Sequence, residues 1–192
     1  PGKVTVPRLI RGEGASPGVV FGPAFRFFEF SESPSSPVSK GAAEPQAELS
    51  RFRSAVEECR QELQKLADET RESLGREKAL IFEAEALFLE DPAFVEDIEN
   101  FISAGRGRAE EGLKAVLASL EEELSAVPDP YLRGRVADLR DVGSRLEALL
   151  TGKKTGVLGD FREPVILIAG EFLPSQTARM DRTKILGLIS EK

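Results

Sequence analysis

The sequence contains no histidine and no tryptophan, and it has a single cysteine, Cys59, among its 192 residues. Without histidine and with one thiol, the chain lacks the usual zinc ligand set and any histidine-based catalytic triad. One cysteine cannot form an internal disulfide, which fits a reducing compartment. We therefore expect a cytoplasmic protein that carries none of these common catalytic centres.

Long apolar runs are also missing. No run approaches the roughly 20 residues that cross a bilayer, and no signal peptide opens the chain. The sequence has no G-x-x-x-x-G-K-[ST] loop and no complete G-x-G-x-x-G fingerprint. A net charge of −7 argues against nucleic acid, which requires clustered positive charge. We expect neither a membrane nor nucleic acid as a partner; the acidic charge favours a basic protein partner or serves solubility alone.

What is present divides into three zones. Residues 1–40 are rich in Gly, Pro, Ser and Phe, which indicates strands and turns, and residues 29–44 form a polar linker. Residues 41–152 are charged, with apolar residues at helical spacing, and residues 153–192 return to short β-branched runs. This order predicts a helical unit inserted into an α/β domain.

The helical zone breaks at glycine and proline into segments with one apolar stripe each. The first stripe steps by three and four residues until Gly75: Leu49, Phe52, Val56, Cys59, Leu63, Leu66 and Thr70. In the second, which ends before Pro92, we expect the core to be formed by Leu80, Ile81, Ala84, Leu87 and Phe88. Further stripes run over 94–102, 113–124 and 132–150. These segments should pack as antiparallel hairpins.

The last zone predicts a strand–helix–strand unit. Val165 to Ala169 and Ile185 to Ile189 are continuous apolar runs, as expected of strands buried on both faces. Between them, residues 174–178 indicate a short helix with Ser175 as its N-cap. Such a unit favours parallel strands.

Four stretches carry a family resemblance. They are Gly14-Ala15-Ser16-Pro17-Gly18-Val19-Val20-Phe21-Gly22; Glu77 to Ala84 with Leu87 to Pro92; Ala137-Asp138-Leu139-Arg140-Asp141-Val142-Gly143-Ser144-Arg145-Leu146 with Tyr131-Leu132-Arg133; and Leu173-Pro174-Ser175-Gln176-Thr177-Ala178. In this order they resemble enzyme I of the bacterial phosphoenolpyruvate:sugar phosphotransferase system, a phosphoenolpyruvate-protein phosphotransferase. The third stretch is the most specific, and Gly143 within it indicates a close helix contact because glycine in mid-helix costs about 1 kcal/mol relative to alanine.

The resemblance implies a partial swivelling phosphohistidine α/β domain with an inserted four-helix subdomain, two helical hairpins, that binds the phosphocarrier HPr. Residues 1–40 and 153–192 would form the α/β domain, and residues 41–152 the insert. The implied HPr-binding residues are Arg76, Glu77, Lys78, Ile81, Glu85, Phe88 and Arg135. Many relatives carry histidine where this chain has Glu85.

The family passes a phosphoryl group from phosphoenolpyruvate to a histidine in a Gly-Gly-x-Thr-Ser-His motif and then to HPr, in sugar uptake. This chain has no histidine, so the resemblance implies an N-terminal piece of a longer protein that is inactive by itself. Thr177 and Asp138 match the residues that support the missing histidine, as a phosphoryl-accepting ring needs its second nitrogen held. Solvated helix residues are the alternative for both.

Phosphoenolpyruvate and magnesium would bind a C-terminal barrel, through which the parent protein would also form a homodimer. No cofactor is expected in this piece. The parent is plain enzyme I, its nitrogen-regulatory paralogue or a fused multiphosphoryl transfer protein. A helical interaction module without a phosphorelay role is the second hypothesis, and a related phosphoenolpyruvate synthase or pyruvate–phosphate dikinase is a third. A Gly-Gly-x-Thr-Ser-His motif in the following codons of the parent gene would separate the first two.

Overall fold

The computed structural model describes residues 11–27, 44–152 and 161–191. Apart from Glu44, the predicted linker 29–44 lies outside these residues, as do the first ten residues of the chain. Six helices follow one another in the middle of the sequence, and a small sheet is built from strands on either side of them. The predicted fold class, an α/β part with a helical insert, is confirmed; the domain boundaries stay a prediction.

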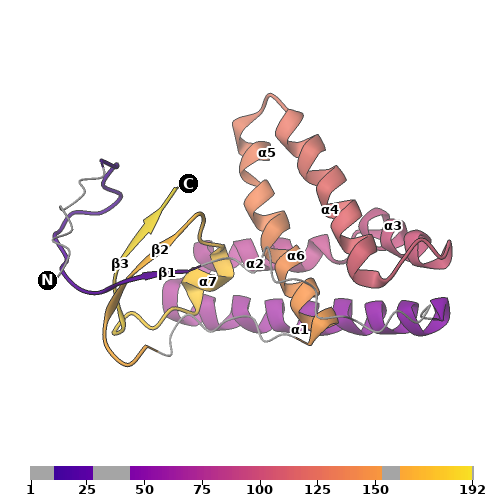
Figure 1. Ribbon diagram of the computed structural model, residues 1–192, viewed down its shortest axis with the longest axis horizontal. Coiled ribbons are helices and arrows are strands. Elements are labelled where there is room, and N and C mark those ends of the chain that lie inside the picture. Colours follow the sequence, from indigo (N-terminus) through magenta and orange to yellow (C-terminus); the bar gives the residue numbers. More distant parts are fainter. Residues whose placement is uncertain (1–10, 28–43, 153–160, 192) are drawn as a thin grey trace, which may run out of the picture.

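The helical part consists of two antiparallel hairpins (Figure 1). The first pairs α1 (Pro45–Leu74) with α2 (Arg76–Phe88), and the second pairs α4 (Ala109–Ala126) with α6 (Val136–Thr151). Two shorter helices complete it: α3 (Pro92–Ser103) packs on α1 and α4, and α5 (Pro130–Gly134) forms the tip of the second hairpin. The segment predicted over 132–150 is thus divided at Arg135.

Local sequence explains where the helices begin and end. Gly75, with φ 90°, lies in a region that favours glycine and separates α1 from α2. Asp91 and Asp129 each precede a proline and accept a hydrogen bond from the backbone N–H two residues later, at 2.9 and 2.8 Å. The proline then occupies the first helical turn, where its missing N–H is not needed.

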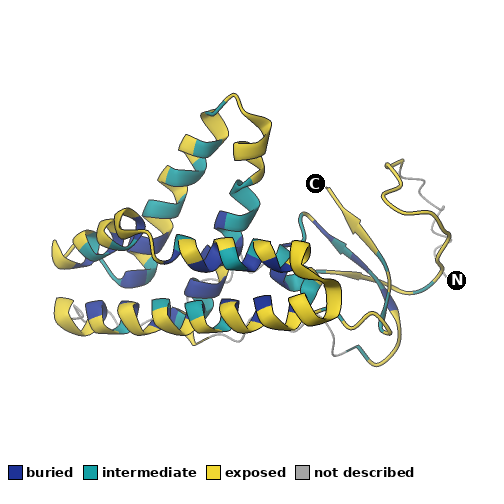
Figure 2. Cartoon of the chain, turned by 180° about the vertical axis from the view of Figure 1, so that it is seen from behind, coloured by how far each residue is buried: buried dark blue, intermediate teal, exposed yellow. Residues whose placement is uncertain are grey.

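The helices share one hydrophobic core, visible as the dark blue inner faces in Figure 2. The stripe predicted for α1 is confirmed: six of its seven residues are buried and Val56 is half-buried. Gly143 makes the expected close contact, because a Cβ atom there would overlap the Leu117 side chain of α4. For α2 the predicted stripe is wrong at three of its five residues, whereas the other two, Ile81 and Phe88, are half-buried and pack against the core. The buried face is formed by Ala79, Phe82, Glu85, Ala86 and Leu89, and Leu80, Ala84 and Leu87 are exposed.

The sheet contains three parallel strands in the order β1 (Ala24–Arg26), β2 (Val165–Ala169) and β3 (Ile185–Ser190). The strand β2 is followed by α7 (Pro174–Ala178) and then by β3, so the predicted strand–helix–strand unit with parallel pairing is confirmed. The predicted burial of β3 on both faces is wrong: β3 is one of the two edge strands of the described sheet, and its Leu186, Leu188 and Ile189 side chains are exposed. A small second core surrounds Val165 and Leu167.

Candidate functional site

An open groove of about 450 Å³ lies between the start of α2 and the tip of the second hairpin. It brings together residues that are more than 40 positions apart in the sequence and come from α2, α5, Arg135 and the first turn of α6. Its lining residues are Glu77, Leu80, Ile81, Pro130, Tyr131, Gly134, Arg135 and Asp138. The groove is therefore a surface shared by two hairpins, lined by both apolar and charged side chains.

Apolar side chains point to solvent around this groove. On α2, Leu80 is 49% exposed and Leu87, two turns later on the same face, is 65% exposed. Across the groove, the Tyr131 side chain of α5 is 66% exposed. Because α2 already buries its opposite face in the core, it is apolar on two sides, which is a pattern typical of a helix that meets a second protein.

The Arg135 side chain is held in place at the groove by two partners. It donates a hydrogen bond to Asp138 at 2.7 Å and another to the Tyr131 hydroxyl, and its guanidinium carbon lies 4.8 Å from the Tyr131 ring centroid. Hydrogen bonding to Asp138 and then to Tyr131 raises the pKa of Arg135. The groove thus presents a fixed positive charge beside an aromatic ring.

The seven predicted partner-binding residues differ in their burial and in their position relative to the groove. Glu77, Ile81 and Arg135 line the groove. Arg76 and Lys78 are exposed on the first turn of α2 but do not line it. Phe88 is half-buried and packs against Phe94, with ring centroids 4.6 Å apart.

Glu85 requires a correction. It was predicted as a docking residue, yet it is 2% exposed and lies on the core face of α2. Burial, followed by the charge of Asp141, raises the pKa of Glu85 to about 9, so the side chain is neutral at pH 7. A buried neutral acid cannot present its carboxylate to a docking partner.

The specific motif of α6 joins the helices to the α/β part. Asp141 accepts hydrogen bonds from the Ser175 backbone N–H at 2.7 Å and from the Ser175 hydroxyl at 2.6 Å. Asp141 and Arg145 are 1% and 3% exposed at their side chains and lie 3.5 Å apart, so they are a buried pair and not solvated helix charges. Ser175 is not the N-cap of α7, a position held by Leu173.

The two predicted support residues lie on elements in contact, α6 and α7. Asp138 is half-buried in the groove and paired with Arg135. Thr177 is exposed on α7, and its hydroxyl donates to the backbone carbonyl of Pro174 at 2.8 Å, which leaves the oxygen lone pairs open. Their role toward a histidine stays a prediction.

Tyr131, Pro130 and Leu80 were not predicted as site residues. Tyr131 was part of the family motif without a role, and Leu80 was assigned to the core. For Leu80, the signal is the second apolar stripe of α2. Leu80 follows Ala79 directly, and only one of two neighbouring residues on a helix can face the core.

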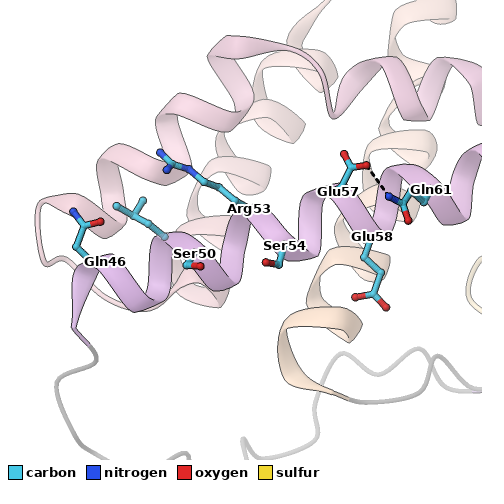
Figure 3. Close-up of a pocket in the computed structure, with 8 residues that line it drawn as sticks. Gln46, Ser50, Arg53, Ser54, Glu57, Glu58 and Gln61 are labelled. Carbon is cyan, nitrogen blue, oxygen red and sulfur yellow. Dashed lines mark hydrogen bonds between the residues drawn. The ribbon is translucent and has the colours of Figure 1, made fainter.

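A larger depression of about 700 Å³ follows the outer face of α1, from Gln46 to Gln61 (Figure 3). All of its described lining residues belong to this one helix, and one internal hydrogen bond joins Gln61 to Glu57 at 2.7 Å. Residues from different elements meet in the α2–α5 groove and not here, so we assign the candidate site to that groove.

Comparison with known proteins identifies the family. The N-terminal domain of PEP-utilising enzymes matches residues 11–135. The chain belongs to this family. The matched range covers β1, the helices α1 to α5 and Arg135, the arginine that lines the groove.

Known proteins with a similar sequence are phosphoenolpyruvate-protein phosphotransferases. Those of Priestia megaterium, Bacillus subtilis and Haemophilus influenzae are 33%, 31% and 32% identical over 95% of this chain. The chain spans about a third of the length of these relatives, 31% in the first case.

Two solved structures have a similar fold. One, described as the NMR solution structure of enzyme I (nEIt), is 34% identical, with a TM-score of 0.65 over 77% of this chain and 60% of its own. The other, described as the N-terminal domain of Enzyme 1 - Nitrogen, is 24% identical, with a TM-score of 0.62 over 90% of this chain and 69% of its own, and shows the fold alone.

The described residues include neither a membrane-spanning helix nor a group of metal-ligating side chains. Among them, no helix is both long and apolar enough to span a membrane. Within the same ranges, no three or more His, Cys, Asp or Glu side chains are grouped so as to hold a metal ion.

Proposed function

We propose that this chain is the carrier-docking part of a phosphoenolpyruvate-protein phosphotransferase and that HPr docks in the α2–α5 groove. The observation that carries the proposal is the exposed Leu80, which lines the groove with Tyr131 and Arg135 and is followed two turns later on the same face of α2 by the exposed Leu87. An apolar centre within a charged rim is the usual pattern of a protein interface. The net charge of −7 favours a basic partner.

In this proposal, Thr177 and Asp138 hold the ring of a phosphorylated histidine that is not part of the sequence. The Thr177 oxygen has free lone pairs to accept from a ring N–H, and Asp138 supplies a carboxylate from the helical side. Phosphoenolpyruvate and magnesium would bind elsewhere in the parent protein, a cytoplasmic homodimer.

Titration of the isotope-labelled chain with HPr, followed by NMR, tests the docking. We expect salt-sensitive amide shifts at Glu77, Ile81, Tyr131 and Arg135. Leu80→Ser should weaken binding by about tenfold, because an apolar contact at the centre of an interface is lost. Leu186→Ser is the matched control, since Leu186 is also an exposed leucine but lies on β3.

Two results would contradict this proposal. One is the absence of shifts at near-millimolar HPr, which would favour the interaction module without a phosphorelay role. The other is equal weakening by the α2 and β3 leucine variants, which would point to nonspecific apolar association.

A further inference from the structure

The strongest contact between the helices and the α/β part is made by one buried carboxylate. Both oxygens of Asp141 are used by the same residue: Oδ2 accepts the Ser175 N–H at 2.7 Å and Oδ1 accepts the Ser175 hydroxyl at 2.6 Å. Both residues are buried. Two short bonds to one carboxylate fix the orientation of α7 as well as its distance from α6.

Other contacts between the two parts are more exposed. Arg140 of α6 bonds Glu171, just before α7, at 2.9 Å, and Arg179, just after α7, lies 3.7 Å from Glu62 of α1. The Arg140–Glu171 pair is half-buried and the Arg179–Glu62 pair is exposed, so solvent screens both more than it screens the Asp141–Ser175 bonds. Of these polar contacts, the buried Asp141–Ser175 contact constrains the position of α7 most closely, and Ala178 of α7 adds apolar packing against the helical core.

The position of α7 determines the position of Thr177. On α6, Asp138 precedes Asp141 by three residues, so the two carboxylates lie on the same side of the helix. On α7, Thr177 follows Ser175 by two residues in a helix only five residues long. We propose that Asp141 is a positioning residue that holds Thr177 in register with Asp138. The inference rests on the proposed function, in which these two side chains flank a phosphohistidine.

Asp141→Asn tests this role in the complete 192-residue chain. Residual dipolar couplings of the Thr177 methyl group, measured against the α6 amides, report the orientation of Thr177. Amide hydrogen exchange reports the Ser175 bond directly. We expect the Thr177 couplings to change while those of α1 to α4 are retained, and exchange at Ser175 to accelerate at least about tenfold.

Asp181→Asn is a matched control. Asp181 accepts from the Thr183 N–H at 2.9 Å and from its hydroxyl at 2.6 Å, the same pair of bonds within a single exposed turn. The Asp181→Asn variant should leave the residual dipolar couplings of Thr177 unchanged. A change of equal size in both variants would overturn the proposal.

A second variant addresses folding, because Asp141→Asn leaves the buried Arg145 with a weaker counter-charge. Ser175→Ala keeps that charge pair and the N–H bond and removes only the hydroxyl bond. It should shift the Thr177 couplings in the same direction, and Ser175→Thr, which restores a hydroxyl, should return them. Unchanged Thr177 couplings in folded Asp141→Asn and Ser175→Ala would show that Asp141 stabilises the contact without positioning Thr177.

The docking titration separates this inference from the proposed function. Asp141 does not line the groove, so Asp141→Asn should keep HPr affinity within about twofold of the original chain. Loss of docking in the unmodified chain contradicts the proposed function, whereas unchanged Thr177 couplings contradict only the positioning role.

Discussion

The Glu85 side chain lies in the core near three charged groups of α6, namely Asp138, Asp141 and Arg145. Burial and the two aspartates disfavour its carboxylate, and Arg145 favours it; burial prevails, which raises the pKa to about 9. In the described structure both Glu85 carboxyl oxygens lack a protein hydrogen-bond partner. A glutamate at this position therefore contributes to packing and not to charge.

This protonation makes stability depend on pH. The Glu85 pKa rises from an ordinary 4.5 in the unfolded chain to about 9 in the folded one. Between these values the folded state binds a proton that the unfolded state does not, so the free energy of unfolding falls as pH rises through this window. Glu85→Gln removes the titration. We expect it to stabilise the chain by about 1–3 kcal/mol at pH 8 and to have little effect at pH 4.

Urea unfolding of both chains at pH values from 4 to 9 measures this difference. Other carboxylates titrate in both chains and cancel in the comparison. Glu58→Gln, at an exposed position of α1, is the control and should show no such trend. A difference between Glu85→Gln and the original chain that is the same at every pH would contradict the assignment.

At the scale of elements, one arginine of α1 joins three helices. Arg51 donates to Glu110 of α4 at 2.6 and 3.0 Å, to Glu48 at 2.6 Å and to the Leu150 carbonyl at the end of α6 at 2.7 Å. Glu48 in turn accepts the Ala109 N–H at the start of α4. These bonds satisfy backbone groups that helix ends leave without intrahelical partners.

Arg51→Met should destabilise the chain by about 2 kcal/mol, because it removes the arginine donor from the Leu150 carbonyl and from the carboxylates of Glu110 and Glu48, of which Glu48 keeps the Ala109 N–H. Arg53→Met is the matched control. Arg53 also forms a two-bond pair with a glutamate of another helix, Glu99, but its side chain is exposed, so its loss should leave stability nearly unchanged. Chemical unfolding measures the free energy of unfolding of both variants. An equal loss of stability in the two would contradict a particular role of Arg51 in joining the three helices.

Sequence periodicity predicted elements well where one apolar stripe was present. In α1, steps of three and four residues identified the buried face, and the glycine and the Asp-Pro pairs marked the helix ends. In α2 apolar residues occupy both faces, so periodicity alone did not distinguish the core from the groove, and Glu85 broke the expected correlation of charge with exposure. The Asp141–Ser175 bond joins residues 34 positions apart, a distance over which local spacing carries no information.

At the scale of the whole molecule, the described residues form two separate hydrophobic cores of unequal size. The helices share a cluster of 18 buried residues, whereas the cluster of the sheet has two buried residues with five partly buried side chains around them. Strand β3 also exposes Leu188 and Ile189 at an edge of the described sheet. Burial of apolar area is the main source of stability, so the α/β part is the weaker of the two.

We therefore expect the chain to unfold in two steps, with the α/β part opening first. Amide hydrogen exchange should give β2 and β3 lower protection than the buried face of α1, and a thermal scan followed by far-ultraviolet circular dichroism should lose most helical signal in the second step. Ser175→Ala should move the first step to lower temperature and leave the second in place, because the hydroxyl bond that it removes joins the two parts, whereas the Asp141–Arg145 pair of the helices is kept. Glu58→Gln should move neither step. A single transition with equal protection in both parts would mean that the contacts of α7 make the two cores one cooperative unit.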